Sequence, residues 1–289
     1  MNKTKNTVQA MQLPVNQLRP FEGHPFQVKD DAEMDQLVWS ILTQGLLTPI
    51  TVRPLENNEY EVISGHRRLH ACQKAGIKTV PALIYTLDRD AAAIALVDSN
   101  LHREKILPSE KAYAYKLKMD AMSRQGQRTD LTLSQVATKL DTAAEIGKSV
   151  GESRDKVFRY IRLTALIPEI LAMVDSGKIA LTPAVELSYL KEPEQLELVE
   201  TIAYEDATPS LAQAIKLRDF SKSGRLNADV ILSIMCEKKP NQAEKISFRT
   251  DRLKQYLPKN ITPKETEEYV LKALEYYHRH RAKTQNRDR

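Results

Sequence analysis

A run of nine residues in the first quarter of the chain combines a glycine, two adjacent arginines and two histidines: Ile63-Ser64-Gly65-His66-Arg67-Arg68-Leu69-His70-Ala71. It follows a strand-like alternating run at 59–63 and opens a helix-like run that ends near Gly76. Free N–H groups and the dipole at a helix N-terminus favour an anion, and arginine adds a charged, bidentate donor. The pattern therefore predicts phosphate binding. Ordinary solvated charges at Arg67 and Arg68 remain an open alternative, because this motif is weak by itself.

Two further stretches, one after this run and one before it, carry polar or charged side chains. Downstream stand Ser99-Asn100-Leu101-His102-Arg103 and Leu107-Pro108-Ser109-Glu110-Lys111-Ala112, and upstream stand Gly45-Leu46-Leu47-Thr48-Pro49-Ile50 and Thr51-Val52-Arg53. In this order and spacing the three stretches resemble the ParB family of DNA-segregation proteins. The family motifs are G-L-L-Q-P-I, G-E-R-R-x-R-A, and E-N-x-x-R followed by L-x-P-x-E-x-A. The resemblance covers about residues 8–190 and fades after that.

The resemblance implies a nucleotide site in the N-terminal part of the chain. ParB-like proteins bind CTP with magnesium, and the nucleotide closes two protomers into a clamp on DNA. By resemblance, Gly65, Arg67 and Arg68 hold phosphates and residues 45–50 line the base and sugar. Asn100 then lies beside the magnesium, next to Ser99, and Arg103 lies near the nucleotide. The nucleotide-binding residues are therefore expected to be Gly45, Leu46, Leu47, Thr48, Gly65, His66, Arg67, Arg68, Ser99, Asn100 and Arg103.

The motifs depart from the family pattern at several positions. Ser99 stands where the family has glutamate, Thr48 replaces glutamine, and His66 and His70 replace a glutamate and an arginine. A carboxylate orients water or coordinates magnesium better than a neutral hydroxyl does. We therefore expect CTP binding to be retained and hydrolysis to be slow or absent, so that any enzymatic activity is a weak CTPase. Asp98 or Glu104 could supply the missing acid.

The elements that must position these residues form a small mixed α/β unit. Strand-like runs occur at 8–13, 50–53, 60–63 and 80–85. Helices are predicted from an Asp30 N-cap to Gly45, at 67–74 and at 89–100. From Pro108 the strand signals stop, and an amphipathic helix at 108–122 precedes a polar break at 126–130 and a capping-box pattern at 132–135.

A second chemically informative region, 144–163, has helix-turn-helix spacing. One helix ends at Val150, Gly151 makes the turn and Ser153 caps the next helix, whose Val157, Ile161 and Ala165 are expected to pack on the first. Residues 147–166 hold five Lys/Arg against two Asp/Glu. Such a helix fits a major groove, although a solvated helical hairpin gives the same pattern. The candidate DNA-binding residues are Lys148, Ser153, Arg154, Lys156, Arg159, Tyr160 and Arg162.

The fold class expected from these patterns is α+β. A ParB/sulfiredoxin-like nucleotide-binding domain (1–106) precedes an all-α domain (107–224) with the helix-turn-helix at about 142–165. A small C-terminal region (225–289) contains a candidate self-association helix at 262–282 and a basic tail. The helix is amphipathic, so packing within its own domain is the alternative reading, and the tail is either a non-specific phosphate contact or a solubilising segment.

Composition is that of an ordinary globular protein. The chain has 289 residues, 28% charged residues, a net charge of +5 and a pI of about 9.0, which alone does not establish nucleic-acid binding. Two distant cysteines fit a reducing compartment. No apolar run approaches the ~18 residues of a membrane span, and no secretory signal is visible, so we expect a cytoplasmic, DNA-associated protein without a membrane partner.

The function that the resemblance implies is partition of DNA. The protein would bind a specific double-stranded site as a homodimer, under control by CTP, and work with a ParA-type ATPase. One alternative is a transcriptional regulator or nucleoid-occlusion factor that does not hydrolyse nucleotide. A kinase on the same fold is a second alternative. Sulfiredoxin chemistry is unlikely because it needs cysteine where Gly65 stands, and Cys72 lies past the turn.

Overall fold

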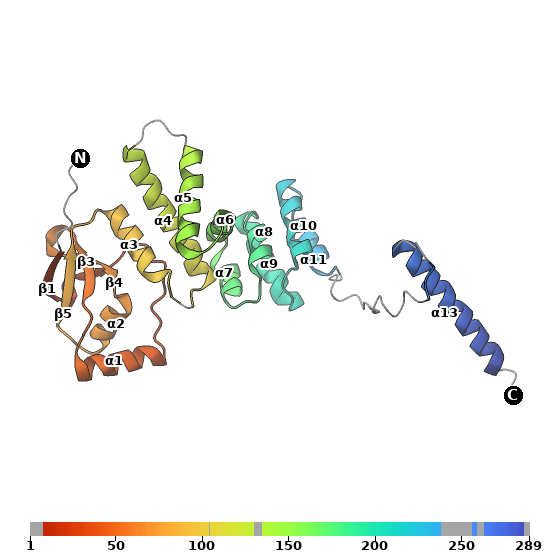
Figure 1. The fold of residues 1–289 in the computed structure, drawn as a ribbon, viewed down its shortest axis with the longest axis horizontal. Coiled ribbons are helices and arrows are strands. Elements are labelled where there is room, and N and C mark those ends of the chain that lie inside the picture. The colour runs from red at the N-terminus through yellow and green to blue at the C-terminus, as the bar shows by residue number, and fades with distance from the viewer. Residues whose placement is uncertain (1–7, 104, 130–134, 238–255, 259–262, 286–289) are drawn as a thin grey trace. The chain divides into compact units, whose positions relative to one another are not determined.

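The computed structural model describes residues 8–103, 105–129, 135–237, 256–258 and 263–285. Within these ranges the chain divides into two compact units, Met1–Glu237 and Lys238–Arg289. The first unit contains a mixed sheet domain followed by helices, and the described part of the second contains one long helix (Figure 1). The α+β class expected from the sequence is confirmed.

The sheet of the N-terminal domain has five strands among the described residues, in the order β1-β5-β3-β4-β2. The strands are β1 (Val8–Pro14), β2 (Leu18–Pro20), β3 (Ile50–Pro54), β4 (Tyr60–Ser64) and β5 (Thr79–Tyr85). The β1–β5 and β3–β4 pairs are antiparallel, whereas β3–β5 and β2–β4 are parallel. The four predicted strands are confirmed. The short β2 was missed, because three residues that end in proline give little strand signal.

Helices cover both faces of this sheet. Val62 of β4 packs in a core with α1 (Ala32–Gln44) and α2 (His66–Lys74), and the next residue, Ile63, packs in a second core with α3 (Arg89–Asn100). Successive strand residues point to opposite faces, so β4 joins the two cores. Short 3-10 turns η1 (Val15–Gln17) and η2 (Glu56–Asn58) connect the strands.

Helix α1 begins one residue later than predicted. The N-cap is Asp31, whose carboxylate accepts a hydrogen bond from the Met34 amide at 2.9 Å. The predicted cap, Asp30, instead accepts hydrogen bonds from His70 and Lys74 of α2. Both carboxylates therefore hold this end of α1, but only Asp31 caps it. Gly45 ends the helix as predicted.

Eight further helices of the first unit are described. They are α4 (Pro108–Thr129), α5 (Gln135–Val150), α6 (Arg154–Arg162), α7 (Pro168–Asp175), α8 (Leu181–Leu187), α9 (Glu192–Glu205), α10 (Leu211–Lys222) and α11 (Ala228–Met235), with the 3-10 turn η3 (Leu163–Ala165) after α6. The break predicted at 126–130 is wrong, because α4 runs through Gly126 to Thr129. The first three residues of the capping-box pattern at 132–135 lie outside the described residues.

The helical core extends past the predicted boundary at 224. Ile231, Ile234 and Met235 of α11 are buried in one cluster with α9 and α10, so this unit continues to Glu237. The division at 106 stays a prediction, since both sides of it belong to the same unit. None of the helices in the described ranges has both the length and the apolar run needed to cross a membrane.

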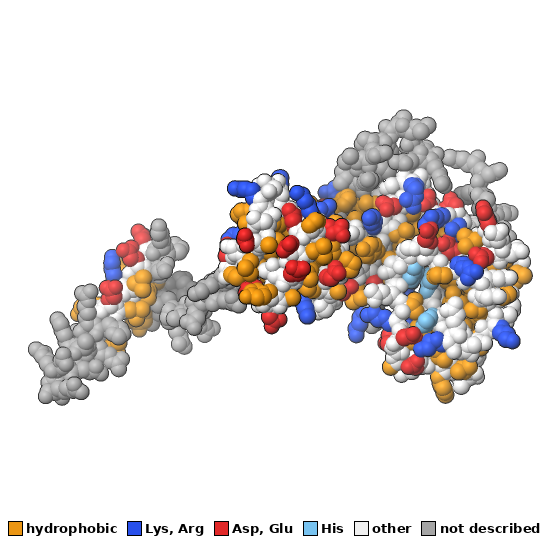
Figure 2. Space-filling model, turned by 180° about the vertical axis from the view of Figure 1, so that it is seen from behind, with side chains coloured by type: hydrophobic (Ala, Val, Ile, Leu, Met, Phe, Trp, Pro, Cys, Tyr) orange, Lys and Arg blue, Asp and Glu red, His pale blue; other side chains and the backbone are white. Residues whose placement is uncertain are grey.

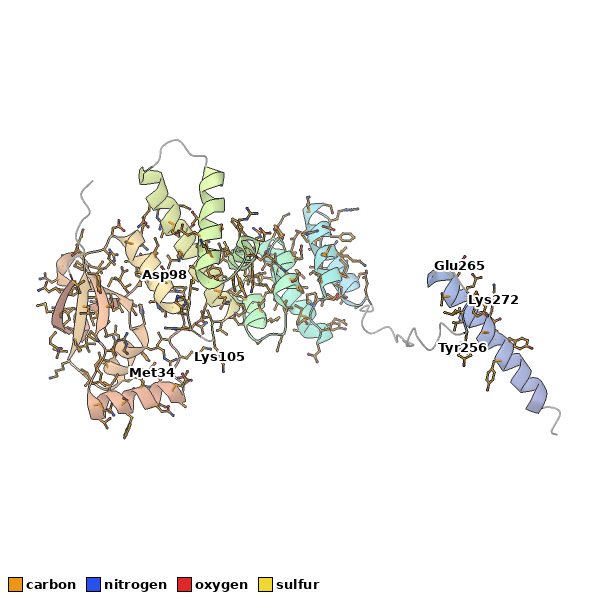
Figure 3. All side chains as sticks on the ribbon, viewed as in Figure 1. Met34, Asp98, Lys105, Tyr256, Glu265 and Lys272 are labelled. Carbon is orange, nitrogen blue, oxygen red and sulfur yellow. The ribbon has the colours of Figure 1, made fainter. Side chains whose placement is uncertain are left out.

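The second unit contains α13 (Pro263–Gln285), which begins at the proline that the sequence indicated. Its Lys272 pairs with Glu268 at 3.3 Å, one turn away, and Figure 3 shows Lys272 and Glu265 on this helix. The large hydrophobic side chains Tyr269, Leu271, Leu274, Tyr276 and Tyr277 are exposed. The helix is thus confirmed. Its self-association stays a prediction, and the side chains of the basic tail lie outside the described residues.

Candidate functional site

The turn between β4 and α2 has the backbone of an anion site. Gly65 adopts φ 104° and ψ 23°, a left-handed conformation that favours glycine, and it caps α2 without contributing a side chain. The first-turn N–H groups of α2 are therefore left for another acceptor. His66, Arg67 and Arg68 occupy this first turn, as the sequence predicted.

The Arg68 side chain supports the turn between β4 and α2 by contacts with the loop before β3. Its Nη1 donates to the carbonyl oxygens of Thr48 and Pro49, each at 2.7 Å, and a Cβ on Gly65 would meet its Nη2 at 3.2 Å. Burial lowers the pKa of the Arg68 guanidinium. In this structure Arg68 fixes the loop at 45–49 against α2, and direct phosphate binding by it stays a prediction. Leu46 packs towards the sheet core, while Leu47 is 78% exposed.

Arg67 and Arg103 supply positive charge around the turn. Arg67 lies 3.4 Å from Asp31 and 3.3 Å from Glu33, so it also bridges to the start of α1. The Arg103 guanidinium lies 5.4 Å from the centre of the Phe26 ring. Burial lowers the pKa of Arg103, and the nearby charge of Arg67 lowers it further against the opposing effect of Glu110. An anion here would relieve this repulsion.

Asn100 is 4% exposed and committed to its own helix. Its amide nitrogen donates to the Leu96 carbonyl oxygen at 2.8 Å and to Ser99 Oγ at 3.1 Å. Among the residues described, no group of three or more His, Cys, Asp or Glu side chains could hold a metal ion. Both contacts of Asn100 use the amide nitrogen, so they do not involve its side-chain oxygen, the atom that would bind a metal, and magnesium binding by Asn100 stays a prediction.

His66 packs against a second histidine, His24, which the sequence did not indicate, with the two ring planes tilted by 38°. The ring centres of His66 and His24 lie 3.7 Å apart, and the Phe21 amide donates to His66 Nε2 at 3.5 Å. Burial, His24 and Arg103 together lower the pKa of His66 to about 3. Burial also lowers the pKa of His24. Figure 2 shows histidine side chains on the face of the N-terminal domain that this view presents.

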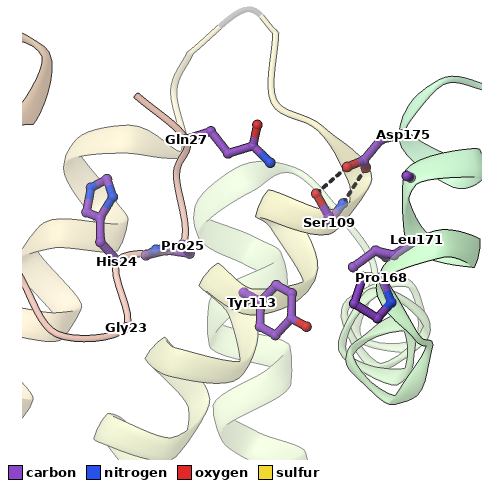
Figure 4. Close-up of a pocket in the computed structure, with 10 residues that line it drawn as sticks. Gly23, His24, Pro25, Gln27, Ser109, Tyr113, Pro168, Leu171 and Asp175 are labelled. Carbon is purple, nitrogen blue, oxygen red and sulfur yellow. Dashed lines mark hydrogen bonds between the residues drawn. The ribbon is translucent and has the colours of Figure 1, made fainter. Parts of the chain in front are cut away.

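The loop that carries His24 is fastened to the helices that follow. Glu110, at the start of α4, accepts from the Gln27 amide at 2.8 Å and from the Leu107 amide at 3.0 Å. Next to this contact lies a cleft of about 470 Å³ between the 23–27 loop, α4 and α7, with Ser109 hydrogen-bonded to Asp175 (Figure 4). The 23–27 loop and the start of α4 are therefore linked through one carboxylate.

The helix-turn-helix has the geometry that its sequence predicted. Helix α5 ends at Val150, Gly151 takes φ +70°, and Ser153 caps α6 through the Lys156 amide at 3.2 Å. Val157 of α6 is buried. Ala165, however, lies in η3 and is exposed, so its predicted packing is wrong; α6 ends at Arg162, before that position.

The predicted DNA-binding residues divide into two groups. Lys148, Ser153, Arg154 and Lys156 are exposed, and Arg159 is half-buried beside Thr182, with its Nη2 at 2.5 Å from Oγ1. Tyr160 and Arg162 instead face the protein. Tyr160 packs edge-on against Tyr115, and Arg162 donates to Ser188 and lies 4.0 Å from the Tyr189 ring centre. The first group offers a basic surface, whereas the second group holds α6 in place.

Glu152, in the turn between α5 and α6, is the main anchor of the helix-turn-helix on α4. Its carboxylate accepts from Lys111 Nζ at 3.0 Å and Tyr115 Oη at 2.9 Å, and pairs with Lys156 Nζ at 3.2 Å. Burial opposes ionisation, yet these three partners lower the pKa of Glu152 below its usual range. Sequence reasoning missed this role because Lys111 and Tyr115 lie on α4 and are brought to Glu152 by tertiary packing, whereas Lys156 is only four residues away.

Gly147 is required by the close approach of this turn to α5. The Glu152 amide donates to the Gly147 carbonyl oxygen at 2.8 Å, and a Cβ on Gly147 would lie 2.5 Å from the Glu152 carbonyl oxygen. We expect Gly147→Ala to lower the free energy of unfolding by about 1–3 kcal/mol, because backbone must move. Urea unfolding measures it.

Gly151→Ala is the comparison for this prediction. Gly151 has open space around it, so alanine there meets only the strain of a positive φ, about 1 kcal/mol. An effect of Gly147→Ala no larger than that of Gly151→Ala would contradict the close approach.

Both domains of the first unit match known families. The ParB N-terminal domain matches residues 1–101, and the ParB HTH domain matches residues 132–210. The chromosome-partitioning protein Spo0J of Thermus thermophilus is 31% identical over 210 residues, which are 72% of this chain and 71% of that protein. The chain belongs to the ParB family.

Other relatives within the ParB family are matched over a smaller share of their length. A probable chromosome-partitioning protein ParB of Pseudomonas putida is 34% identical over 64% of this chain and 58% of its own length. A nucleoid occlusion protein of Bacillus cereus is 32% identical over 67% of this chain and 61% of its own length. The chain thus spans less than two thirds of these two relatives.

Two solved structures of C-terminally truncated ParB from Caulobacter crescentus are also similar. One is complexed to the centromeric parS site, with 25% identity, a TM-score of 0.41 and coverage of 74% of this chain and 99% of that chain. The other is complexed with CTP-gamma-S, with 27% identity, a TM-score of 0.31 and coverage of 68% and 99%.

Proposed function

We propose that this protein is a ParB-type partition protein, which binds a specific duplex site through α5 and α6 and is regulated by CTP at the Gly65 turn. The observation that best supports this proposal is the order of the two matched domains along the chain. A ParB N-terminal domain with an open helix N-terminus precedes a ParB HTH domain whose basic residues lie exposed on and beside its second helix.

At the nucleotide site each side chain has a distinct proposed role. The first-turn N–H groups of α2 donate hydrogen bonds to the phosphates, and Arg67 and Arg103 neutralise the phosphate charge. Arg68 holds residues 45–48 where they can face the base and sugar. The structure gives no protein cage for magnesium, so the ion stays a proposal from family resemblance alone, and hydrolysis with Ser99 in place of glutamate stays an expectation.

The partners of the whole protein are likewise proposals. We infer a homodimer, with the exposed apolar side chains of α13 as one candidate contact, and a ParA-type ATPase as the motor. A cytoplasmic, DNA-associated location follows from the same function. A specific duplex is the primary ligand, and its sequence is the first quantity to determine, by chromatin precipitation with sequencing.

A nucleoid-occlusion factor or transcriptional regulator is the second candidate, favoured by the similarity to the Bacillus cereus protein. Amine-reactive cross-linking of the full chain separates it from a CTP-gated clamp. Cross-linked dimer should rise when CTP and the specific duplex are present together, and not with scrambled duplex. An equal yield with and without CTP would favour the regulator. A serine-phosphorylation assay tests the kinase alternative.

Arg159 is expected to read a base edge. Arg159→Ala should weaken binding to the specific duplex by about 1–3 kcal/mol, because a bidentate arginine–base contact is lost. The measurement is a titration against specific and scrambled duplexes at one salt concentration. An equal loss on both duplexes would make Arg159 a phosphate contact instead.

Arg162→Ala is the matched comparison on the same helix. Since Arg162 contacts Ser188 and Tyr189, its removal should lower stability together with DNA affinity. Arg159→Ala should leave the urea midpoint nearly unchanged, because its side chain is bonded only to one surface hydroxyl among the contacts described.

A further inference from the structure

The packed pair His24–His66 has no role in the function proposed above. The two rings come from a loop and from the first residue of α2, which are 42 positions apart, and their centres lie 3.7 Å from each other. His24 Nε2 is buried and has no hydrogen-bond partner in the structure. His66 Nε2 already accepts from the Phe21 amide. An unpartnered ring nitrogen therefore lies beside the Gly65 turn.

The charged groups around the pair are mostly positive. Arg103, after α3, acts on both rings, and Arg67 of α2 acts on Arg103. In the described part of the chain, the carboxylate that opposes these charges is Glu110 of α4, which raises the pKa of His24. Its two oxygens accept from the Gln27 and Leu107 amides, so they are occupied by backbone donors. In the free protein both rings are held neutral by burial and by this positive surround.

We propose that the His24–His66 pair takes up a proton when a nucleotide triphosphate binds at the Gly65 turn, so that protonation strengthens nucleotide binding. The proposal rests on the proposed nucleotide site and adds His24 to it. A triphosphate brings several negative charges close to the rings and offsets Arg67 and Arg103. The imidazolium then becomes favourable. The proton comes from solvent, and no covalent bond forms or breaks.

His24 also lies at the edge of the cleft of about 470 Å³ next to the 23–27 loop, on the side away from Ser109 and Asp175 (Figure 4). A positive charge on His24 would change the electrostatic environment of the 23–27 loop, which Glu110 of α4 holds by a hydrogen bond. Nucleotide binding, the protonation of His24 and the position of α4 would therefore be linked through neighbouring contacts.

Calorimetry with CTP tests the inference on the full chain. Binding is measured in buffers of different ionisation enthalpy at several pH values from 6 to 8, which counts protons taken up. The wild type should take up more protons than the double variant H24Q/H66Q. Its CTP affinity relative to the variant should rise as pH falls, by up to about tenfold per pH unit for each full proton. Because the wild type and the variant bind the same nucleotide, the protons exchanged by its phosphates cancel in the difference between the two proteins.

The outcomes are distinct. CTP binding with equal proton uptake in both proteins overturns this inference and leaves the proposed function intact. The absence of CTP binding by the wild type overturns the proposed function. If the double variant does not fold, NMR of the six imidazole rings in the wild type decides. At pH 6.5, CTP must convert at least one neutral ring to imidazolium, and six unchanged rings overturn the inference.

Discussion

Glu152→Ala is expected to lower the free energy of unfolding of the first unit by about 3 kcal/mol. The substitution removes the acceptor of Lys111 and Tyr115 and the ion-pair partner of Lys156. The Glu152 side chain is only 9% exposed, and Lys111 is 26% exposed, so one lysine would be left largely desolvated without its counter-charge. Breaking one side of a buried pair is more destabilising than replacing both.

The loss should also reach DNA binding. Helix α6 contacts α4 through this carboxylate and through Tyr160, which lies edge-on to Tyr115 and 5.3 Å from Lys111 Nζ. Without Glu152 the orientation of α6 is less restricted, and we expect weaker binding to specific and random duplexes alike. That uniform loss differs from the selective loss expected for Arg159→Ala.

Asp155→Ala is the matched control for Glu152→Ala. Asp155 lies three residues after Glu152, in the first turn of α6, is 80% exposed, and pairs with Arg154 at 3.3 Å. An exposed ion pair of this kind contributes little, so the change should stay within about 0.5 kcal/mol. Urea unfolding of both variants at one pH gives the comparison. Equal stability of the two variants would show that Glu152 is not an anchor.

Local features of the fold could be predicted where one residue determines them. Gly45 and Gly151 end helices because their positive φ angles favour glycine, and the Ser153 cap follows from its hydroxyl. The predicted break at 126–130 failed because one glycine lowers helix stability by only about 1 kcal/mol, which α4 tolerates. Adjacent Asp30 and Asp31 could not be told apart as caps from their types alone.

The partners of long charged side chains could not be predicted. Arg68 and Arg162 are predicted ligand contacts, and the sequence did not indicate that their guanidinium groups also bond to the protein backbone. Glu152 gathers partners from α4 and α6. The partners of a long side chain depend on how distant elements pack against each other. Neither the residue type nor the local spacing predicts that packing. His24 was missed for the same reason, because the residue it contacts, His66, lies 42 positions away in the sequence.

The pH dependence of stability should depend strongly on His66. Its pKa is about 3 in the folded protein, below the ordinary value of 6.5 that applies to the unfolded chain. Above pH 6.5 both states are neutral and the stability is fully present. As pH falls from 6.5 towards 3, the unfolded state takes up a proton that the folded state does not, so stability is lost. Each pKa unit is about 1.4 kcal/mol, giving at most about 5 kcal/mol.

Solvent reaches part of the His66 side chain, so we expect a loss of about 3 kcal/mol between pH 7 and pH 3.5. Urea unfolding of wild type and His66→Gln across this range isolates the effect, because glutamine does not titrate and the acid response of other groups cancels in the difference. The wild type should lose more stability than the variant as pH falls. His102→Gln, which replaces an exposed ring, should follow the wild type. Parallel pH profiles for wild type and His66→Gln would mean that the ring becomes charged in the folded protein, and that its contacts with His24 and Arg103 do not keep it neutral.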